Sequence, residues 1–233
     1  MKLPEAPEPL PADGPAGAMP WEGKPERVDR VIMGGLIASG LYALLLLPLS
    51  PALIGTHPLA LEIIRGSVTS IITMGALART GQASLFVAVV AAIPALIMFD
   101  WVFWLAGRRW GHRAVTLLLG RGKPKRDRQI RRLEGTMRRL GPAAVLFGYV
   151  LPLPTALIDA AAGWVGMRLR TFLILDVLGA LLWTGLLAGL GYAIGQPAAD
   201  VAHAIGRHAL WFTLAIVALI VAKQMRDARR AAV

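Results

Sequence analysis

The chain alternates between long apolar stretches and short polar or basic blocks, a pattern typical of an all-α integral membrane protein. Four apolar stretches approach the roughly 20 residues that a helix needs to cross the hydrocarbon core of a bilayer. They cover residues 31–49, 83–107, 171–195 and 210–222. We therefore expect about four transmembrane helices. The first should end at Pro48 and Pro51, because proline lacks the backbone donor that continues a helix.

Two further apolar stretches are interrupted, and they predict re-entrant hairpins. The first, residues 59–80, contains Glu62, Arg65 and a centre rich in Ser and Thr. The second is broken by Pro152 and Pro154. Irregular backbone survives at membrane depth only where protein or a water-filled cavity covers it. The hairpins are therefore candidates for a transport or binding site.

The charges predict which side of the membrane each connection occupies. Residues 108–140 hold twelve Lys or Arg against two acidic residues, and residues 223–230 hold four against one. The positive-inside rule places both segments in the cytoplasm, whereas residues 196–207, with one Arg, should lie outside. This topology requires each hairpin to leave on the side from which it entered, so the two hairpins have opposite orientations. The N- and C-termini should both be cytoplasmic.

Composition divides the chain into three parts. Residues 1–30 are rich in proline and acidic residues and should form a disordered cytoplasmic tail. Residues 31–225 should form the membrane domain, and residues 226–233 a basic cytoplasmic tail.

The two halves of the membrane domain resemble each other when the chain is shifted by 88 residues. The aligned pairs include Gly75 with Gly163, Trp104 with Tyr192 and Gly107 with Gly195. Because the hairpins enter from opposite sides, this repeat would be inverted, as in transporters that bind substrate near the membrane midplane. The alternative is chance similarity between apolar, glycine-rich segments. We expect Gly163, together with Pro152 and Pro154, to shape the second hairpin.

Several motifs, in their order and spacing, carry a family resemblance. They are ALARTG at 76–81, FDWVFWLAGRRWG at 99–111, LGPAAVLFGYVLPLP at 140–154, AAGWVGM at 161–167 and FLILDVLGALLWTGLLAGLGYAIG at 172–195. Over about residues 58–197 the chain resembles the DedA family, also called the VTT or SNARE-associated Golgi group. The resemblance implies two oppositely oriented re-entrant hairpins and movement of lipids across or between leaflets, often coupled to an ion.

The chain differs from the DedA pattern where the family carries its chemistry. Two arginines are usual in the second hairpin of bacterial relatives, and Tyr149 and Thr155 stand at those positions. Asp100 matches an aspartate common in the long helix, and Asp176 stands where an asparagine is frequent. The resemblance therefore implies a divergent or repurposed member.

Four residues are candidates for substrate binding. They are Arg65, Tyr149, Thr155 and Asp159. A carboxylate at membrane depth, such as that of Asp159, is costly enough to suggest a function; alternatively, it caps the second half of the hairpin. Arg65 could bind an anionic head group near the hairpin tips, at Thr155 and residues 67–70, although those hydroxyls could instead only satisfy backbone carbonyls. In a further alternative, Arg65 pairs with Glu62 three residues earlier.

Three acidic residues are candidates for ion coupling or ion pairing. They are Glu62, Asp100 and Asp176. Asp100 lies about two helical turns from the cytoplasmic end of its helix. A salt bridge to Arg108 is therefore an alternative to proton transfer.

Residues 128–141 predict an amphipathic helix within the basic segment. Its apolar stripe consists of Ile130, Leu133, Met137 and Leu140, and arginines cover the rest. Such a helix would lie at the cytoplasmic membrane surface and attract anionic lipids. The alternative is a topology determinant with no contact to substrate.

The remaining composition excludes several function classes. The chain has no cysteine, and its four histidines are scattered, so we expect no metal site and no cofactor. It lacks the metal-binding carboxylate pair or supported nucleophile of a lipid phosphatase, so we expect no enzyme. No folded basic domain suggests nucleic-acid binding. We expect a lipid translocase for a polyprenyl phosphate or phospholipid in the bacterial cell membrane. The alternatives are a transport-inactive scaffold or assembly factor and a proton-coupled small-solute transporter. Any of these is compatible with a homo-oligomer.

Overall fold

The computed structural model describes residues 20–21, 24–119, 126–207, 211 and 218, and within them every regular element is a helix. The helices are α1 (Arg27–Thr56), α2 (Pro58–Arg65), α3 (Val68–Arg79), α4 (Leu85–Val90), α5 (Ile93–Ile97), α6 (Asp100–Trp110), α7 (His112–Leu119), α8 (Arg126–Leu140), α9 (Ala143–Leu146), α10 (Thr155–Trp164), α11 (Leu169–Ile194) and α12 (Gln196–Arg207). The all-α prediction is confirmed for this part of the chain.

Among the described residues, three segments are long and apolar enough to cross a membrane. They are Arg27–Pro51, Leu85–Trp110 and Leu169–Ile194. These segments confirm three of the four predicted spans. The fourth, 210–222, lies outside the described residues except for Trp211 and Ala218.

The first long helix does not end where the prolines predicted. Helix α1 continues through Pro48 and Pro51 to Thr56. The carbonyl of Leu46, in the turn that contains Pro48, accepts hydrogen bonds from Ser50 Oγ of the same helix (2.7 Å) and from the Arg65 guanidinium of α2 (3.3 Å). Because neighbouring side chains satisfy backbone groups near a proline, an apolar helix can tolerate it.

The second long segment is interrupted rather than continuous. Turns at residues 91–92 and 98–99 separate α4, α5 and α6. Pro94 at the start of α5 contributes to the first break, since its nitrogen cannot donate to the preceding turn. The second break leaves Asp100 as the first residue of α6.

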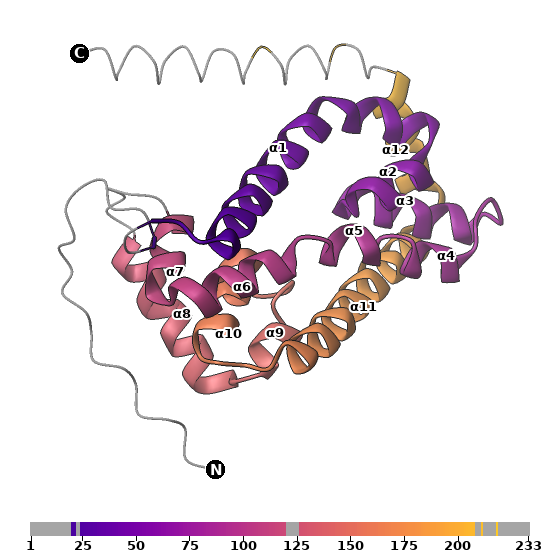
Figure 1. Ribbon diagram of the computed structural model, residues 1–233. Helices are drawn as coiled ribbons and strands as arrows, with labels where there is room; N and C mark the ends of the chain where they lie inside the picture. Colours follow the sequence, from indigo (N-terminus) through magenta and orange to yellow (C-terminus); the bar gives the residue numbers. More distant parts are fainter. Residues whose placement is uncertain (1–19, 22–23, 120–125, 208–210, 212–217, 219–233) are drawn as a thin grey trace.

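The helices form two groups at opposite ends of the molecule. Helices α6 to α10 gather at one end and α2, α3, α4 and α12 at the other, while α1 and α11 run between them (Figure 1). Residues 196–207, which the sequence predicted as a plain connection, form α12 and pack against α1 and α3. Each end has its own core, with Phe172 in one cluster of buried side chains and Leu187 in the other.

Glycines allow very close helix contacts at both ends. A Cβ on Gly163 of α10 would lie 1.9 Å from the carbonyl oxygen of Trp104 in α6, and one on Gly107 of α6 would lie 1.7 Å from that of Ala160 in α10. The contacting residue number rises on one helix as it falls on the other, so α6 and α10 are antiparallel. Small residues commonly let membrane helices approach in this way.

The same contact recurs between α3 and α11. A Cβ on Gly75 would lie 2.1 Å from the carbonyl oxygen of Ala188, and one on Gly191 would lie 2.0 Å from that of Ile72. The contact glycines of the two short helices, Gly75 of α3 and Gly163 of α10, are 88 residues apart, which is the shift that aligned the two halves of the sequence. In both cases, a short helix from one half of the chain packs on a long segment from the other half.

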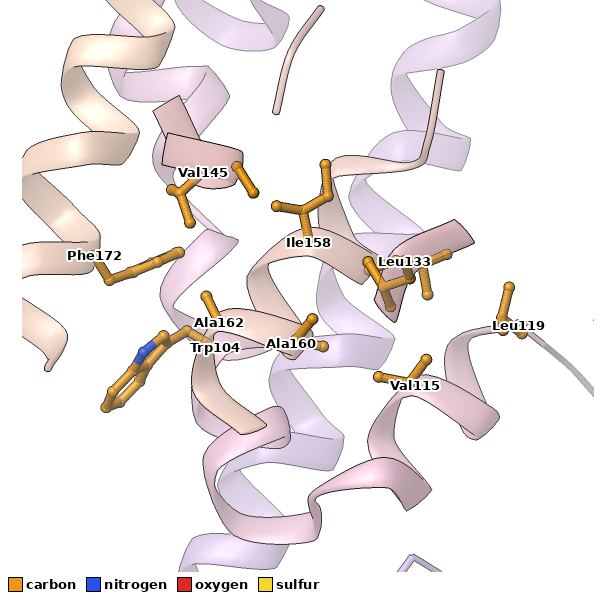
Figure 2. Close-up of a cluster of buried hydrophobic side chains, with 12 residues drawn as sticks. Trp104, Val115, Leu119, Leu133, Val145, Ile158, Ala160, Ala162 and Phe172 are labelled. Carbon is orange, nitrogen blue, oxygen red and sulfur yellow. The ribbon is translucent and has the colours of Figure 1, made fainter. Parts of the chain in front are cut away.

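The apolar stripe of α8 faces the protein rather than a lipid surface. Leu133 is buried in the cluster around α10, and Ile130 and Met137 pack against the same cluster. Figure 2 shows Leu133 beside Ile158, within the set of buried side chains that also includes Phe172. The helix is amphipathic as predicted, but most of its apolar stripe packs against the hydrophobic core of the protein.

Candidate functional site

The candidate site is a group of buried acidic residues joined by one tyrosine. The hydroxyl of Tyr149 lies 3.1 Å from Asp100 Oδ2 and 3.2 Å from Asp176 Oδ1. Asp100 starts α6, Asp176 lies in α11, and Tyr149 lies in the turn between α9 and α10. The tyrosine therefore links both long segments to the proline-containing part of the chain.

Asp159 of α10 adds a third carboxyl group to this region. Its side chain is 3% exposed, and the charges of Asp100 and Asp176 both act on it. The Oδ2 atoms of Asp159 and Asp176 have no hydrogen-bond partner within the described structure. We name Asp100, Tyr149, Asp159 and Asp176 the carboxyl cluster. No Lys, Arg or His among the described residues forms an ion pair with it.

The helical positions of these residues follow from local sequence. Asp100 reaches the cluster because the break at 98–99 starts a new helix there. Gly163 and Gly107 hold α10 tightly against α6, and Asp159 lies on α10 one residue before Ala160, the residue that Gly107 contacts. Gly179, one turn after Asp176, lets α11 approach α9, where an added Cβ would lie 2.6 Å from the Leu146 carbonyl oxygen.

The geometry of the cluster makes its hydrogen bonding depend on its proton count. A phenol has one proton and can donate to only one acceptor at a time. If Asp100 and Asp176 are both ionised, the hydroxyl of Tyr149 therefore satisfies only one of them. With one additional proton, one carboxyl group can donate to the Tyr149 oxygen while the phenol donates to the other. Low-polarity surroundings make the first arrangement costly.

Two of the alternatives raised by the sequence are wrong. Asp159 does not cap a half-helix, because α10 begins at Thr155, its N-cap is Pro154, and Asp159 lies inside the helix. Asp100 does not pair with Arg108: within the described residues it forms no salt bridge, and its side chain accepts a hydrogen bond from Tyr149. The sequence singled out Asp159 as a costly carboxylate and Asp100 and Asp176 as candidates for coupling or ion pairing, but nothing in it showed that Tyr149 bridges Asp100 and Asp176.

The structure does not bring Arg65 and Glu62 together as an ion pair. The guanidinium of Arg65 donates to Ser50 Oγ and to the carbonyl of Leu46 on α1. Glu62 is fully buried, and neither carboxylate oxygen has a partner among the described residues. Within the described part of the chain, Arg65 makes no hydrogen bond or salt bridge to the carboxyl cluster.

Two of the hydroxyl groups predicted to bind phosphate, those of Ser67 and Ser70, form hydrogen bonds with the backbone at the start of α3. Ser67 caps α3 by accepting from the backbone N–H of Ser70, and the hydroxyl of Ser70 donates to the carbonyl of Ser67. Thr155 is half-buried at the first turn of α10, with Pro152 and Pro154 in the turn before it. The alternative in which hydroxyls satisfy the backbone is confirmed for Ser70.

Another buried acidic residue, Asp29, which the sequence did not single out, connects α1 to α6. Asp29 is 2% exposed and accepts hydrogen bonds from the Trp110 indole (2.8 Å) and from Arg109 Nε (3.3 Å). Arg109 also forms a 2.7 Å salt bridge to Glu26. Both carboxylate oxygens of Asp29 accept hydrogen bonds within this contact, Oδ1 from Trp110 and Arg109 and Oδ2 from the Glu26 backbone N–H, so we assign Asp29 a structural role.

Comparisons with known proteins agree with a membrane protein of one family. The family model described as the VTT domain matches residues 64–193. An "Alkaline phosphatase-like protein" of Lactococcus lactis subsp. cremoris (strain MG1363) is 30% identical over 112 residues, which are 46% of this chain and 52% of the relative. A protein of the same name from Lactococcus lactis subsp. lactis (strain IL1403) is 33% identical over 112 residues, with the same coverage.

The chain therefore spans about half the length of the curated relatives it matches. No solved structure matches the chain. The VTT-domain match covers more than half of the residues, and it includes the whole carboxyl cluster. Together with three long apolar helices, this match shows that the chain belongs to the VTT-domain family, also called DedA.

Proposed function

We propose that this protein moves an anionic lipid, a polyprenyl phosphate or a phospholipid, across the cell membrane, and that the carboxyl cluster carries the coupling proton. The observation that supports this proposal is the buried contact of Tyr149 with Asp100 and Asp176 beside Asp159. Ionisable residues inside membrane segments commonly mark substrate paths and proton relays.

The coupling follows from charge. When the cluster gives up a proton, it gains a negative charge that repels an anionic head group and leaves one carboxylate without the Tyr149 hydrogen bond. Protonation of the cluster removes both the repulsion of the head group and the unsatisfied carboxylate. Proton binding and binding of an anionic lipid near the second hairpin should therefore favour each other, as linked equilibria require.

We propose further that α2 with α3, and the turn after α9 with α10, are the two re-entrant hairpins of an inverted repeat. Helix α3 has 12 residues and α10 has 10, which is too short to cross a bilayer alone. The glycine contacts of α3 on α11 and of α10 on α6 support the proposal, because corresponding short helices meet long segments in the same antiparallel way. In the long segments the corresponding contact glycines are Gly107 and Gly191, which are 84 residues apart. This shift differs by about one helical turn from the 88 residues that the sequence suggested.

The competing functions are a scaffold, a small-solute transporter and an enzyme. The relatives' names contain the word phosphatase, but they describe distant proteins matched over half their length. We propose that this chain is no enzyme. A phosphatase assay with p-nitrophenyl phosphate belongs in the same experiment, and turnover by pure protein would contradict this part of the proposal.

The test is lipid exchange in proteoliposomes that contain the full chain. A fluorescent phospholipid or polyprenyl phosphate reports leaflet exchange by chemical quenching from outside, with and without an imposed pH gradient. Asp159→Asn and Tyr149→Phe remove an ionisable group or a hydroxyl with little change of shape. Asp200→Asn is the matched control, because Asp200 is exposed on α12 and bonds only to Gln196 among its recorded partners.

We expect exchange by the wild type to respond to the pH gradient. Asp159→Asn should remove this response, Tyr149→Phe should slow exchange about tenfold, equivalent to one charge-assisted hydrogen bond, and Asp200→Asn should behave as wild type. Exchange that ignores both the gradient and the cluster variants would contradict proton coupling. Absence of exchange with both lipids, in protein shown to be folded, would favour the scaffold.

A further inference from the structure

A cavity of about 630 Å³ lies between α8 and the turn that precedes α10. Its walls are Gly135, Thr136, Arg139 and Leu140 of α8 and residues 151–153. Ligand sites in proteins commonly measure about 300–1,000 Å³. The cavity lies outside the carboxyl cluster, and its wall at residues 151–153 is the turn of the proposed second hairpin.

The lining of the cavity combines one cation with apolar groups. Arg139 supplies a permanent positive charge and several donors, and Thr136 supplies a hydroxyl. Leu140, Leu151 and Leu153 supply apolar surface. Arg139 forms no ion pair with an acidic residue in the described part of the structure, so its donors remain able to bind a ligand.

Gly135 keeps this space open. A Cβ added to Gly135 would meet no atom within 4 Å, whereas the glycines at the helix contacts would collide with backbone. The absence of a side chain at this position therefore serves neither close packing nor a turn. Because Gly135 is one of the residues that line the cavity, we expect a large side chain at this position to occupy part of that space.

The surroundings indicate a lipid rather than a soluble ligand. The cavity lies at the boundary between the strongly basic α8 and the apolar turn after α9, where Phe147 is 45% and Val150 is 60% exposed. Exposed apolar side chains next to basic ones are typical of a surface at the membrane interface. An anionic head group and the first carbons of its acyl chain meet the same boundary in a bilayer.

We propose that this cavity binds the phosphate-bearing end of a membrane lipid, with Arg139 and Thr136 on the phosphate and Leu151 and Leu153 on the start of the acyl chain. The site is distinct from the proton-carrying cluster and does not depend on translocation. A protein that moves no lipid would still bind one here.

The experiment is lipid binding to the purified full chain, measured by native mass spectrometry from detergent. The probes are dioleoyl phosphatidic acid, dioleoyl glycerol, which lacks the phosphate, and inorganic phosphate as a competitor. Arg139→Gln removes the charge, and Arg128→Gln is the matched control, because Arg128 is exposed on the same helix and does not line the cavity. Gly135→Phe fills the space, and Gly135→Ala controls for the change of helix propensity.

We expect phosphatidic acid to bind and dioleoyl glycerol to bind much more weakly. Arg139→Gln should weaken binding about tenfold or more, as expected for the loss of a charge-assisted hydrogen bond, while Arg128→Gln should change it by less than about twofold, as for a screened surface charge. Gly135→Phe should abolish binding that Gly135→Ala retains.

Three results would overturn the proposal. Equal losses for the two arginine variants would mean that α8 attracts lipids only by its total charge. Full binding by Gly135→Phe would place the lipid outside the cavity. Displacement of phosphatidic acid by inorganic phosphate at equal concentration would show that the site recognises free phosphate and that the acyl chain contributes nothing.

Discussion

Replacement of Gly107 by alanine should separate α6 from α10 and destabilise the protein. The new Cβ would lie 1.7 Å from the carbonyl oxygen of Ala160, 2.6 Å from its carbonyl carbon and 2.8 Å from its Cα. These are backbone atoms, so no side chain can rotate away to relieve the collision. The two helices must move apart by roughly 1.8 Å to reach ordinary van der Waals contact at about 3.5 Å.

The cost follows from the contacts that this movement breaks. A gap of 0.5–1 Å already forfeits about a quarter to a half of each dispersion contact, and the movement would open the seam along which Gly163 lies against Trp104. Overpacking typically costs about 1–3 kcal/mol, partly offset by the higher helix propensity of alanine, which is worth up to about 1 kcal/mol. A collision with backbone atoms belongs at the upper end of the overpacking range, so we expect a net loss of about 2–3 kcal/mol, or a Tm lower by roughly 4–12 °C for a chain of this size.

The assay is thermal unfolding in detergent, followed by intrinsic tryptophan fluorescence. Gly189→Ala is the matched control, because a Cβ on Gly189 of α11 would meet nothing within 4 Å and should leave the Tm unchanged or higher. Gly191→Ala tests the equivalent contact on α3 and should resemble Gly107→Ala. If Gly107→Ala unfolded at the same temperature as Gly189→Ala, the close approach of α6 and α10 would be refuted.

Two further substitutions test local contacts by the same unfolding assay. Trp110→Phe should destabilise the protein by about 1–3 kcal/mol, because buried Asp29 loses the indole donor. Trp101→Phe is the control, because Trp101 is exposed. Equal losses of stability in the two variants would show that the contact between Trp110 and Asp29 has no structural role. Ser67→Ala should lower the free energy of unfolding by about 1 kcal/mol through loss of the α3 cap. Ser84→Ala should change it very little, since the Ser84 side chain forms no capping hydrogen bond to α4. A larger loss at Ser84 than at Ser67 would contradict the assignment of Ser67 as the cap of α3.

The sequence predicted the elements whose signals are local. The long apolar helix at 171–195 appears as Leu169–Ile194, because a continuous apolar run of that length has few alternatives. The interruption of the first hairpin was also visible, and the structure breaks it at Gly66, whose positive φ of 59° suits glycine. The basic segment was correctly predicted to contain an amphipathic helix.

Features that depend on distant residues could not be predicted in the same way. Pro48 and Pro51 predicted a helix end from local sequence, whereas α1 continues to Thr56 and contacts the Arg65 side chain of α2 in this region. A stripe such as that containing Leu133 shows that one helix face is apolar, but not whether lipid or protein covers it. The bridge from Tyr149 to two aspartates depends on tertiary packing that no local pattern encodes.

Each short helix packs on a long segment from the other half of the chain, α3 on α11 and α10 on α6, and this arrangement affects how the protein folds during synthesis. Helix α3 is synthesised early, but its glycine contact is with Ala188 of α11, near the end of the VTT domain. Until α11 enters the membrane, α3 lacks the surface that covers Gly75, and its short length gives it no stable position across the bilayer. The ribosome must therefore deliver almost the entire domain before its first half can become native. Insertion factors that shield polar backbone during this interval would thus determine the yield of folded protein, and a chain cut before α11 should be degraded instead of accumulating as a folded half.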